Sequence, residues 1–166
     1  MDATELFENA MKWLRQHYTD YRFFAERDIV WTVQLWLHSE IERQALSFSV
    51  FNDHTLIDSP RASADLVILE GNTVAVAAEF KYEPHPGRST NRGGDIWHKK
   101  LPVLSIWAES EKDVERARSY INQGKAMVAY SVVIDEGGRH NWRTAPAGSE
   151  WLDWGDGRWA LWSKWQ

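Results

Sequence analysis

The chain contains no cysteine, which excludes a disulfide framework, thiol catalysis and a cysteine-ligated zinc site. It also lacks any apolar run long enough to span a bilayer, so no membrane segment is expected. No internal repeat, low-complexity tract or linker interrupts it, and 166 residues therefore predict a single domain, 1–166. The first residues, MDATELFENAMKWLRQHY, are acidic and amphipathic, unlike a signal peptide, so a cytoplasmic protein is expected.

Basic residues are fewer than acidic ones, 19 against 24, and the formal net charge is −5. This balance argues against a generic nucleic-acid coat, although an enzyme can still use a local basic patch. Apolar residues make up 43% of the chain, enough for an ordinary globular core.

Periodic apolar residues predict an α-α-β-β-β-α-β order, which indicates an α/β sheet with helices on its faces. The predicted helices cover 4–18, 25–44 and 110–124, and the predicted strands cover 45–51, 65–70, 73–82 and 126–134. Thr4 is a candidate N-cap, Ser110 and Asp113 suggest an S-x-x-D cap, and Gly124 suits a helix C-terminus. The run AMVAYSVVI is nearly all apolar, as in a strand covered on both faces.

The segment TVAVAAEFKY ends an apolar strand with a carboxylate, Glu79, and an ammonium, Lys81. A turn at Gly71-Asn72 predicts a hairpin in which Asp65 lies beside residues 78–80. Because Glu79 and Lys81 are two apart, they point to the same face. Paired carboxylates are typical Mg²⁺ ligands, and a nearby lysine can orient or help deprotonate a water and balance developing negative charge. The plainer alternative is an exposed charge pair at a strand end.

Glu26 extends the apolar stripe of Val30, Val33 and Leu37 by one turn toward the N-terminus of the second helix. An acid on the core-facing side of this helix can reach a site at the sheet edge. The alternative is a capping acid favoured by the helix dipole.

Asp65 followed by Glu79-Phe80-Lys81 resembles the Asp…Glu-x-Lys signature of the PD-(D/E)XK nuclease superfamily, whose fold is restriction-endonuclease-like. The α-β-β-β-α-β order over residues 25–134 is similar to that superfamily's core, and Glu26 matches the glutamate that many members carry on the preceding helix. One departure is Ala64, which stands where the motif's name has proline.

The resemblance implies Mg²⁺-dependent hydrolysis of nucleic-acid phosphodiesters, with DNA as the expected substrate and Mn²⁺ as a substitute ion. It implies that Asp65, Glu79, Glu26 and the Phe80 carbonyl bind metal and that Lys81 positions the attacking water. The alternative function is an inactive nuclease-fold module that binds nucleic acid or a protein partner. Either form allows a homodimer.

The segment EPHPGRSTNRGGDIWHKK is locally basic within an acidic chain. Its cationic residues, Arg88, Arg92, Lys99 and Lys100, are candidates for sequence-independent phosphate contacts. The alternative is a solvated loop.

Tryptophan is concentrated in the C-terminal part of the chain, which predicts a hairpin with a turn near Gly155–Gly157. The residues are Trp142, Trp151, Trp154, Trp159, Trp162 and Trp165. We expect them mainly to pack this hairpin against the sheet. Their faces could instead stack on single-stranded bases or line a protein interface.

Overall fold

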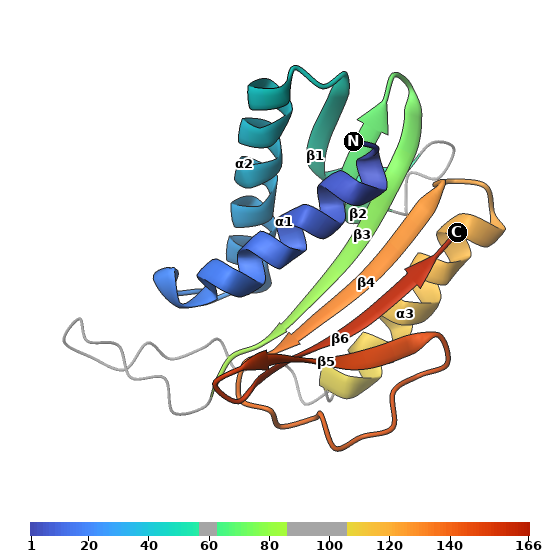
Figure 1. Cartoon of the computed structure of the whole chain (residues 1–166). Coiled ribbons are helices and arrows are strands. Elements are labelled where there is room, and N and C mark those ends of the chain that lie inside the picture. The colour runs from blue at the N-terminus through green and yellow to red at the C-terminus, as the bar shows by residue number, and fades with distance from the viewer. Residues whose placement is uncertain (57–62, 86–105) are drawn as a thin grey trace.

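A computed structural model describes residues 1–56, 63–85 and 106–166 (Figure 1). In chain order the elements are α1 (Ala3–His17), η1 (Tyr18–Asp20), α2 (Glu26–Gln44), β1 (Phe48–Thr55), β2 (Ser63–Glu70), β3 (Thr73–Glu83), α3 (Ile106–Asn122), β4 (Val128–Asp135), β5 (Ser149–Gly155) and β6 (Arg158–Trp165). The α-α-β-β-β-α-β order predicted from the sequence is confirmed, with ends that differ by a few residues. None of the described helices is both long and apolar enough to cross a membrane.

The strands form one mixed sheet in the order β1-β2-β3-β4-β6-β5. Among the described strands only the β3–β4 pair is parallel, and α3 makes the crossover between these strands. Every residue of β4 is buried, as its apolar sequence predicted, because helices cover the sheet on both sides.

The C-terminal hairpin differs from the prediction in one respect. It turns at Gly155–Gly157 as expected, but β6 pairs with β4 and extends the sheet instead of packing on its face. Along the edge of β4 opposite β3, β6 supplies the partners of the backbone N–H and C=O groups.

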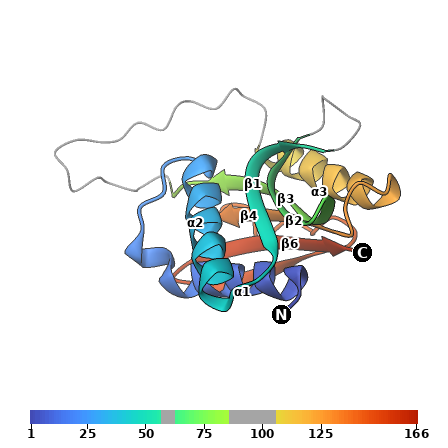
Figure 2. The same cartoon turned by 90° about the horizontal axis from the view of Figure 1, so that it is seen from above.

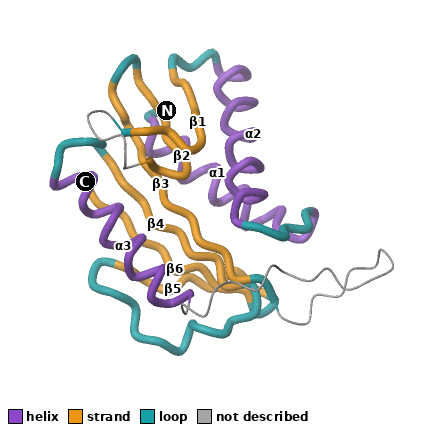
Figure 3. The backbone as a smooth tube through the Cα atoms, turned by 180° about the vertical axis from the view of Figure 1, so that it is seen from behind, coloured by secondary structure: helices purple, strands orange, loops and turns teal. Residues whose placement is uncertain are grey.

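Helices α1 and α2 cover one face of the sheet and α3 covers the other (Figure 2). The larger core cluster includes Phe7, Leu37 and Tyr130 and lies between the sheet and α1 with α2. A smaller cluster, with Ala117 and Tyr120 at its centre, lies under α3. The tube seen from behind shows α3 running along the sheet beside β4 (Figure 3).

Two predicted caps are wrong. Asp2, not Thr4, caps α1, since its side chain accepts from the Glu5 N–H at 2.8 Å. Helix α3 begins at Ile106, so Ser110 and Asp113 lie inside it and do not cap it.

The predicted C-terminus of α3 is correct. Gly124 has φ +63° and donates to the Ile121 carbonyl, while Lys125 donates to the Tyr120 carbonyl. This pair of bonds is the Schellman arrangement, which needs a left-handed residue at the glycine position.

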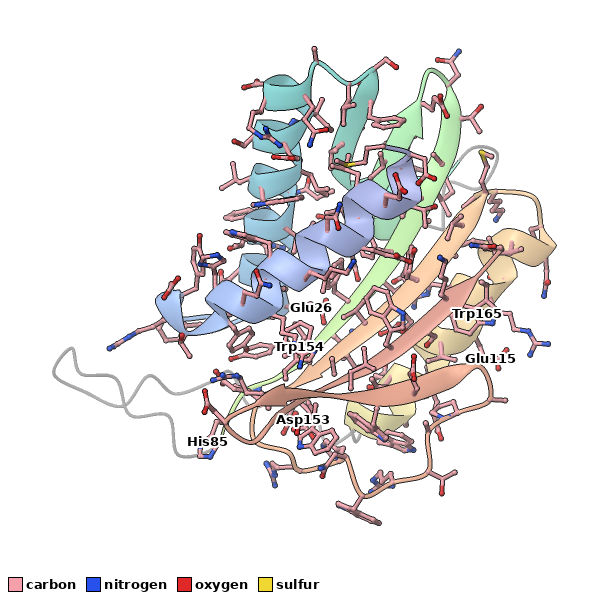
Figure 4. All side chains as sticks on the ribbon, in the orientation of Figure 1. Glu26, His85, Glu115, Asp153, Trp154 and Trp165 are labelled. Carbon is pink, nitrogen blue, oxygen red and sulfur yellow. The ribbon has the colours of Figure 1, made fainter. Side chains whose placement is uncertain are left out.

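Packing in the core accounts for three of the six C-terminal tryptophans. Trp154 is buried against Tyr18 (Figure 4), and Trp162 and Trp165 pack against the two core clusters. Trp142 does not pack in this way, because 74% of it is exposed.

Candidate active site

Strands β2 and β3 bring the two predicted acids together as the hairpin required. Leu66 pairs with Ala78, and the Phe80 N–H donates to Asp65 Oδ2 at 2.7 Å. Asp65 therefore lies beside the Glu79–Phe80 peptide, and its charge raises the pKa of Glu79. The predicted proximity of Asp65 to residues 78–80 is confirmed.

Glu79 is buried on the face covered by α3, with only 1% of it exposed. Its Oε1 accepts from the Tyr120 hydroxyl, and its Oε2 lies 3.0 Å from Arg116 Nη1. Burial, followed by the charge of Asp65, raises the pKa of Glu79 to about 8 in spite of these two donors. A proton therefore competes for this carboxylate at neutral pH.

Lys81 points to the same face as Glu79, as predicted from their spacing. Its Nζ lies 3.1 Å from Glu26 Oε2 and 3.3 Å from Asp113 Oδ2. Burial would lower the pKa of Lys81, but Glu26 and Asp113 outweigh burial and raise it above its ordinary value. Lys81 is therefore an ammonium at neutral pH, which can donate hydrogen bonds and balance charge but cannot act as a base.

Glu26, which Figure 4 labels, reaches this group from the first turn of α2. The cap at this helix end comes from Asp28, whose Oδ2 accepts from the N–H groups of Phe24 and Ala25. The carboxylate of Glu26 is instead paired with Lys81. Glu26 thus pairs with Lys81 while it also lies in the first turn of α2, and its role in a functional site stays a prediction.

The sequence interpretation missed three residues of the group, Asp113, Arg116 and Tyr120, all on α3. Asp113 is buried and joins Lys81 to Arg116, whose Nη1 lies 3.5 Å from Asp113 Oδ1. The available signal was their spacing of three and four residues, which places polar side chains along one helical face.

Negative charge exceeds positive charge in this group. Among the described residues, four carboxyl groups face two cationic side chains; the acids are Glu26, Asp65, Glu79 and Asp113, and the cations are Lys81 and Arg116. Burial raises the pKa of all four acids, and neighbouring carboxylates add to the effect. The formal excess of two charges is the amount that one divalent cation would neutralise.

The donor set suits a hard cation such as Mg²⁺, which binds one or two carboxylates and keeps several waters. Asp65 and Glu79 are the adjacent carboxylates, and Glu26 is held by Lys81. Within the described residues, no group of three or more acidic or imidazole side chains is already arranged to hold a metal. The structure shows the Phe80 N–H engaged with Asp65, and a metal-binding role for the Phe80 carbonyl stays a prediction.

A pocket of about 590 Å³ opens beside the group, between the start of α2 and strands β1 and β2. Glu26 and Asp65 line it, together with Arg27, Trp31 and Asn52. It gives a ligand access to Asp65 from the α2 side.

The predicted phosphate contacts, Arg88, Arg92, Lys99 and Lys100, lie outside the described residues. The strand that leads to them is firmly held. Tyr82 donates from its hydroxyl to Glu136 Oε2 at 2.8 Å, and the His85 N–H donates to the same oxygen at 2.9 Å. The described chain up to His85 is therefore anchored by Glu136.

Comparison of the chain with protein-family models, with curated proteins and with solved structures found no match.

Proposed function

We propose that the protein is a divalent-metal-dependent nuclease with a restriction-endonuclease-like core, which hydrolyses phosphodiester bonds of nucleic acid, with DNA as the expected substrate. The observation that carries the proposal is geometric: Asp65 and Glu79 meet where β2 pairs with β3, and Lys81 on the same strand is held 3.1 Å from Glu26 and 3.3 Å from Asp113. An exposed charge pair at a strand end would show neither the burial nor the raised carboxyl pKa values.

Asp65 and Glu79 would hold Mg²⁺ or Mn²⁺, with Glu26 and the Phe80 carbonyl as further ligands. The bound ion would supply a water of lowered pKa and polarise a phosphoryl oxygen. Lys81 donates a hydrogen bond to the attacking water and offsets negative charge that develops on the phosphoryl group as the P–O bond breaks. Glu26 and Asp113 keep Lys81 charged and fix the position of its Nζ.

The basic segment supplies phosphate contacts in this proposal. Arg88, Arg92, Lys99 and Lys100 would neutralise backbone phosphates and release counterions, which gives affinity without sequence preference. Neutralising all four should weaken binding to every sequence alike and flatten its salt dependence. An unchanged salt slope would return the segment to a solvated role.

One observation favours the alternative, an inactive module of the same fold. Lys81 already pairs with two carboxylates, and both oxygens of Glu79 already have protein donors. Part of the charge is thus balanced without metal, as in a site that no longer works. The raised pKa of Glu79 argues the other way, because the balance is incomplete.

The deciding experiment incubates the purified protein with plasmid, linear duplex DNA, single-stranded DNA and RNA, each with Mg²⁺, Mn²⁺ or chelator. The proposal expects cleavage that needs metal and disappears in Asp65→Ala. Arg118→Gln, an exposed change elsewhere on α3, is the matched control and should cleave like the wild type. Binding of nucleic acid with no cleavage under any condition would establish the alternative.

A further inference from the structure

Arg116 is an unusual partner for a buried carboxylate, because it reaches in from the surface. Its side chain is 49% exposed, whereas that of Glu79 is 1% exposed. The guanidinium contacts Glu79 Oε2 at 3.0 Å and Asp113 Oδ1 at 3.5 Å. Tyr120 and Asp113, the other members of this contact, are both buried within the protein. Arg116 is thus the one described partner of Glu79 that can leave toward solvent by rotating its side chain.

A metal ion on Glu79 would conflict with this arrangement. Mg²⁺ lies about 2.1 Å from its ligand oxygens, so its two charges would sit next to the guanidinium. Like charges at such a distance repel strongly at a partly desolvated site. The repulsion favours departure of the partner that has somewhere to go, which is Arg116.

We infer that Arg116 is a placeholder cation: it occupies Glu79 until a divalent metal binds, and its released guanidinium then takes a phosphate of the nucleic acid. This rests on the proposed function, since it assumes a metal at Asp65 and Glu79. A guanidinium carries a permanent charge and a planar fork of donors that fits phosphate oxygens. Asp113 keeps Lys81 when Arg116 leaves, so the lysine stays in position.

The test measures binding of a fluorescent oligonucleotide by anisotropy, in chelator and in Ca²⁺, with a check that the probe stays intact. Arg116→Gln should weaken binding about 10- to 100-fold in Ca²⁺, the range of a charge-assisted hydrogen bond. It should change binding little in chelator, where Arg116 of the wild type is committed to Glu79. Arg118→Gln removes the same charge two residues away and should have an equal, small effect in both conditions.

A loss of equal size in chelator and Ca²⁺, or no loss in either, would overturn the inference. A second measurement needs no nucleic acid: the structure of the wild-type protein with Mn²⁺ should show Arg116 Nη1 beyond about 4 Å from Glu79, outside ion-pair range. Mn²⁺ bound to Asp65 and Glu79 with Arg116 still in place would overturn the inference and leave the nuclease proposal standing. If Mn²⁺ displaces Arg116 but the protein cleaves no nucleic acid, competition between Arg116 and metal is supported and the nuclease proposal is overturned. If the protein binds no Mn²⁺, the inference and the nuclease proposal are both overturned.

Discussion

Glu8 and Glu79 each receive a tyrosine hydroxyl and a cationic side chain, and the pKa values of these two glutamates move in opposite directions. Glu8 Oε1 accepts from Tyr130 and from Lys164, both at 2.9 Å. Burial would raise the pKa of Glu8, but the hydrogen bonds from Lys164 and Tyr130 outweigh burial and lower it. At Glu79 burial and Asp65 prevail over Tyr120 and Arg116, and the pKa rises to about 8.

The difference lies in the surroundings and not in the partners. The Glu8 side chain is 34% exposed, and a second cation, Lys12, helps to lower its pKa. Glu79 is almost fully buried and has Asp65 and Asp113 among its neighbours. A carboxylate with two donors is therefore structural when the charges around it balance. It is a candidate site when charges of its own sign are buried with it.

The largest expected difference between the two regions is in catalysis. Lys81→Ala should lower cleavage by about 10²- to 10⁴-fold, because the variant loses the group that positions the water. The variant should still fold and bind metal, whereas Asp65→Ala should also lose metal affinity. Lys164→Met, which removes the cation from Glu8, should cleave at the wild-type rate.

Rates of single-turnover cleavage, with calorimetry for Mn²⁺ binding, check this prediction. Circular dichroism should show that all three variants are folded. If Lys81→Ala cleaves as fast as the wild type, Lys81 has no part in the reaction, even if the protein is a nuclease.

The second difference is in the pH dependence of stability without metal. The native pKa of Glu79 lies above its unfolded value, so the native state binds more protons between about pH 4.5 and 8. The contribution of Glu79 to stability is therefore present below the unfolded pKa and is lost as the pH rises through about 8. Glu79→Gln should remove this loss and stabilise the metal-free protein by about 1 to 3 kcal/mol near pH 9.

Urea unfolding of wild type and variant from about pH 5 to 9 measures the effect, with Glu8→Gln as the matched control. The pKa of Glu8 is lowered, so its contribution is present above the unfolded pKa and is lost as the pH falls through the native pKa. Glu8→Gln should therefore destabilise the protein slightly at neutral pH. If both variants respond alike, the contrast in pKa between the two glutamates is wrong.

The third and smaller difference is in the stability that the hydroxyl groups of Tyr120 and Tyr130 contribute. Tyr120→Phe removes a donor from a buried carboxylate and should cost about 1 to 2 kcal/mol near pH 9, where Glu79 is ionised. Tyr130→Phe should cost less, because Lys164 still serves the same oxygen of Glu8. Thermal and urea unfolding of both variants compare them directly, and a larger loss in Tyr130→Phe would reverse the expected order.

Local patterns predicted the part of the site that lies within short stretches of chain. The turn at Gly71-Asn72 predicted the hairpin and the approximate position of Asp65, and the apolar stripe of α2 pointed Glu26 toward the core. The final register also depends on a one-residue shift between Ile68 and Leu69, which the sequence pattern did not predict. The site residues on α3 were missed because Ser110 and Asp113 have the S-x-x-D spacing of a helix N-cap, so Asp113 was assigned to a cap. The helix in fact begins at Ile106.

Long-range pairing was the other part that the sequence could not supply. The pairing of β6 with β4 depends on which strand edge is free in the folded sheet. No local pattern of residues shows which edge that is. The same is true of the contact between Glu8 and Lys164, which are far apart in the chain and meet only through the sheet.

The smallest expected effect is at the Glu8 cluster itself. Lys164→Met keeps most of the side-chain stem over Tyr130 and removes only the charge. Lys164 and Glu8 are both about one-third exposed, so the pair should contribute about 0 to 1 kcal/mol, and this contribution should shrink in high salt. Urea unfolding of Lys164→Met and the wild type at low and high salt measures this contribution. At each salt concentration the variant should bind Mn²⁺ as the wild type does. A loss well above 1 kcal/mol that persists in high salt would mean that Glu8 depends on its cation as a buried acid does. The balanced and unbalanced carboxylates would then no longer be distinguished by their surroundings.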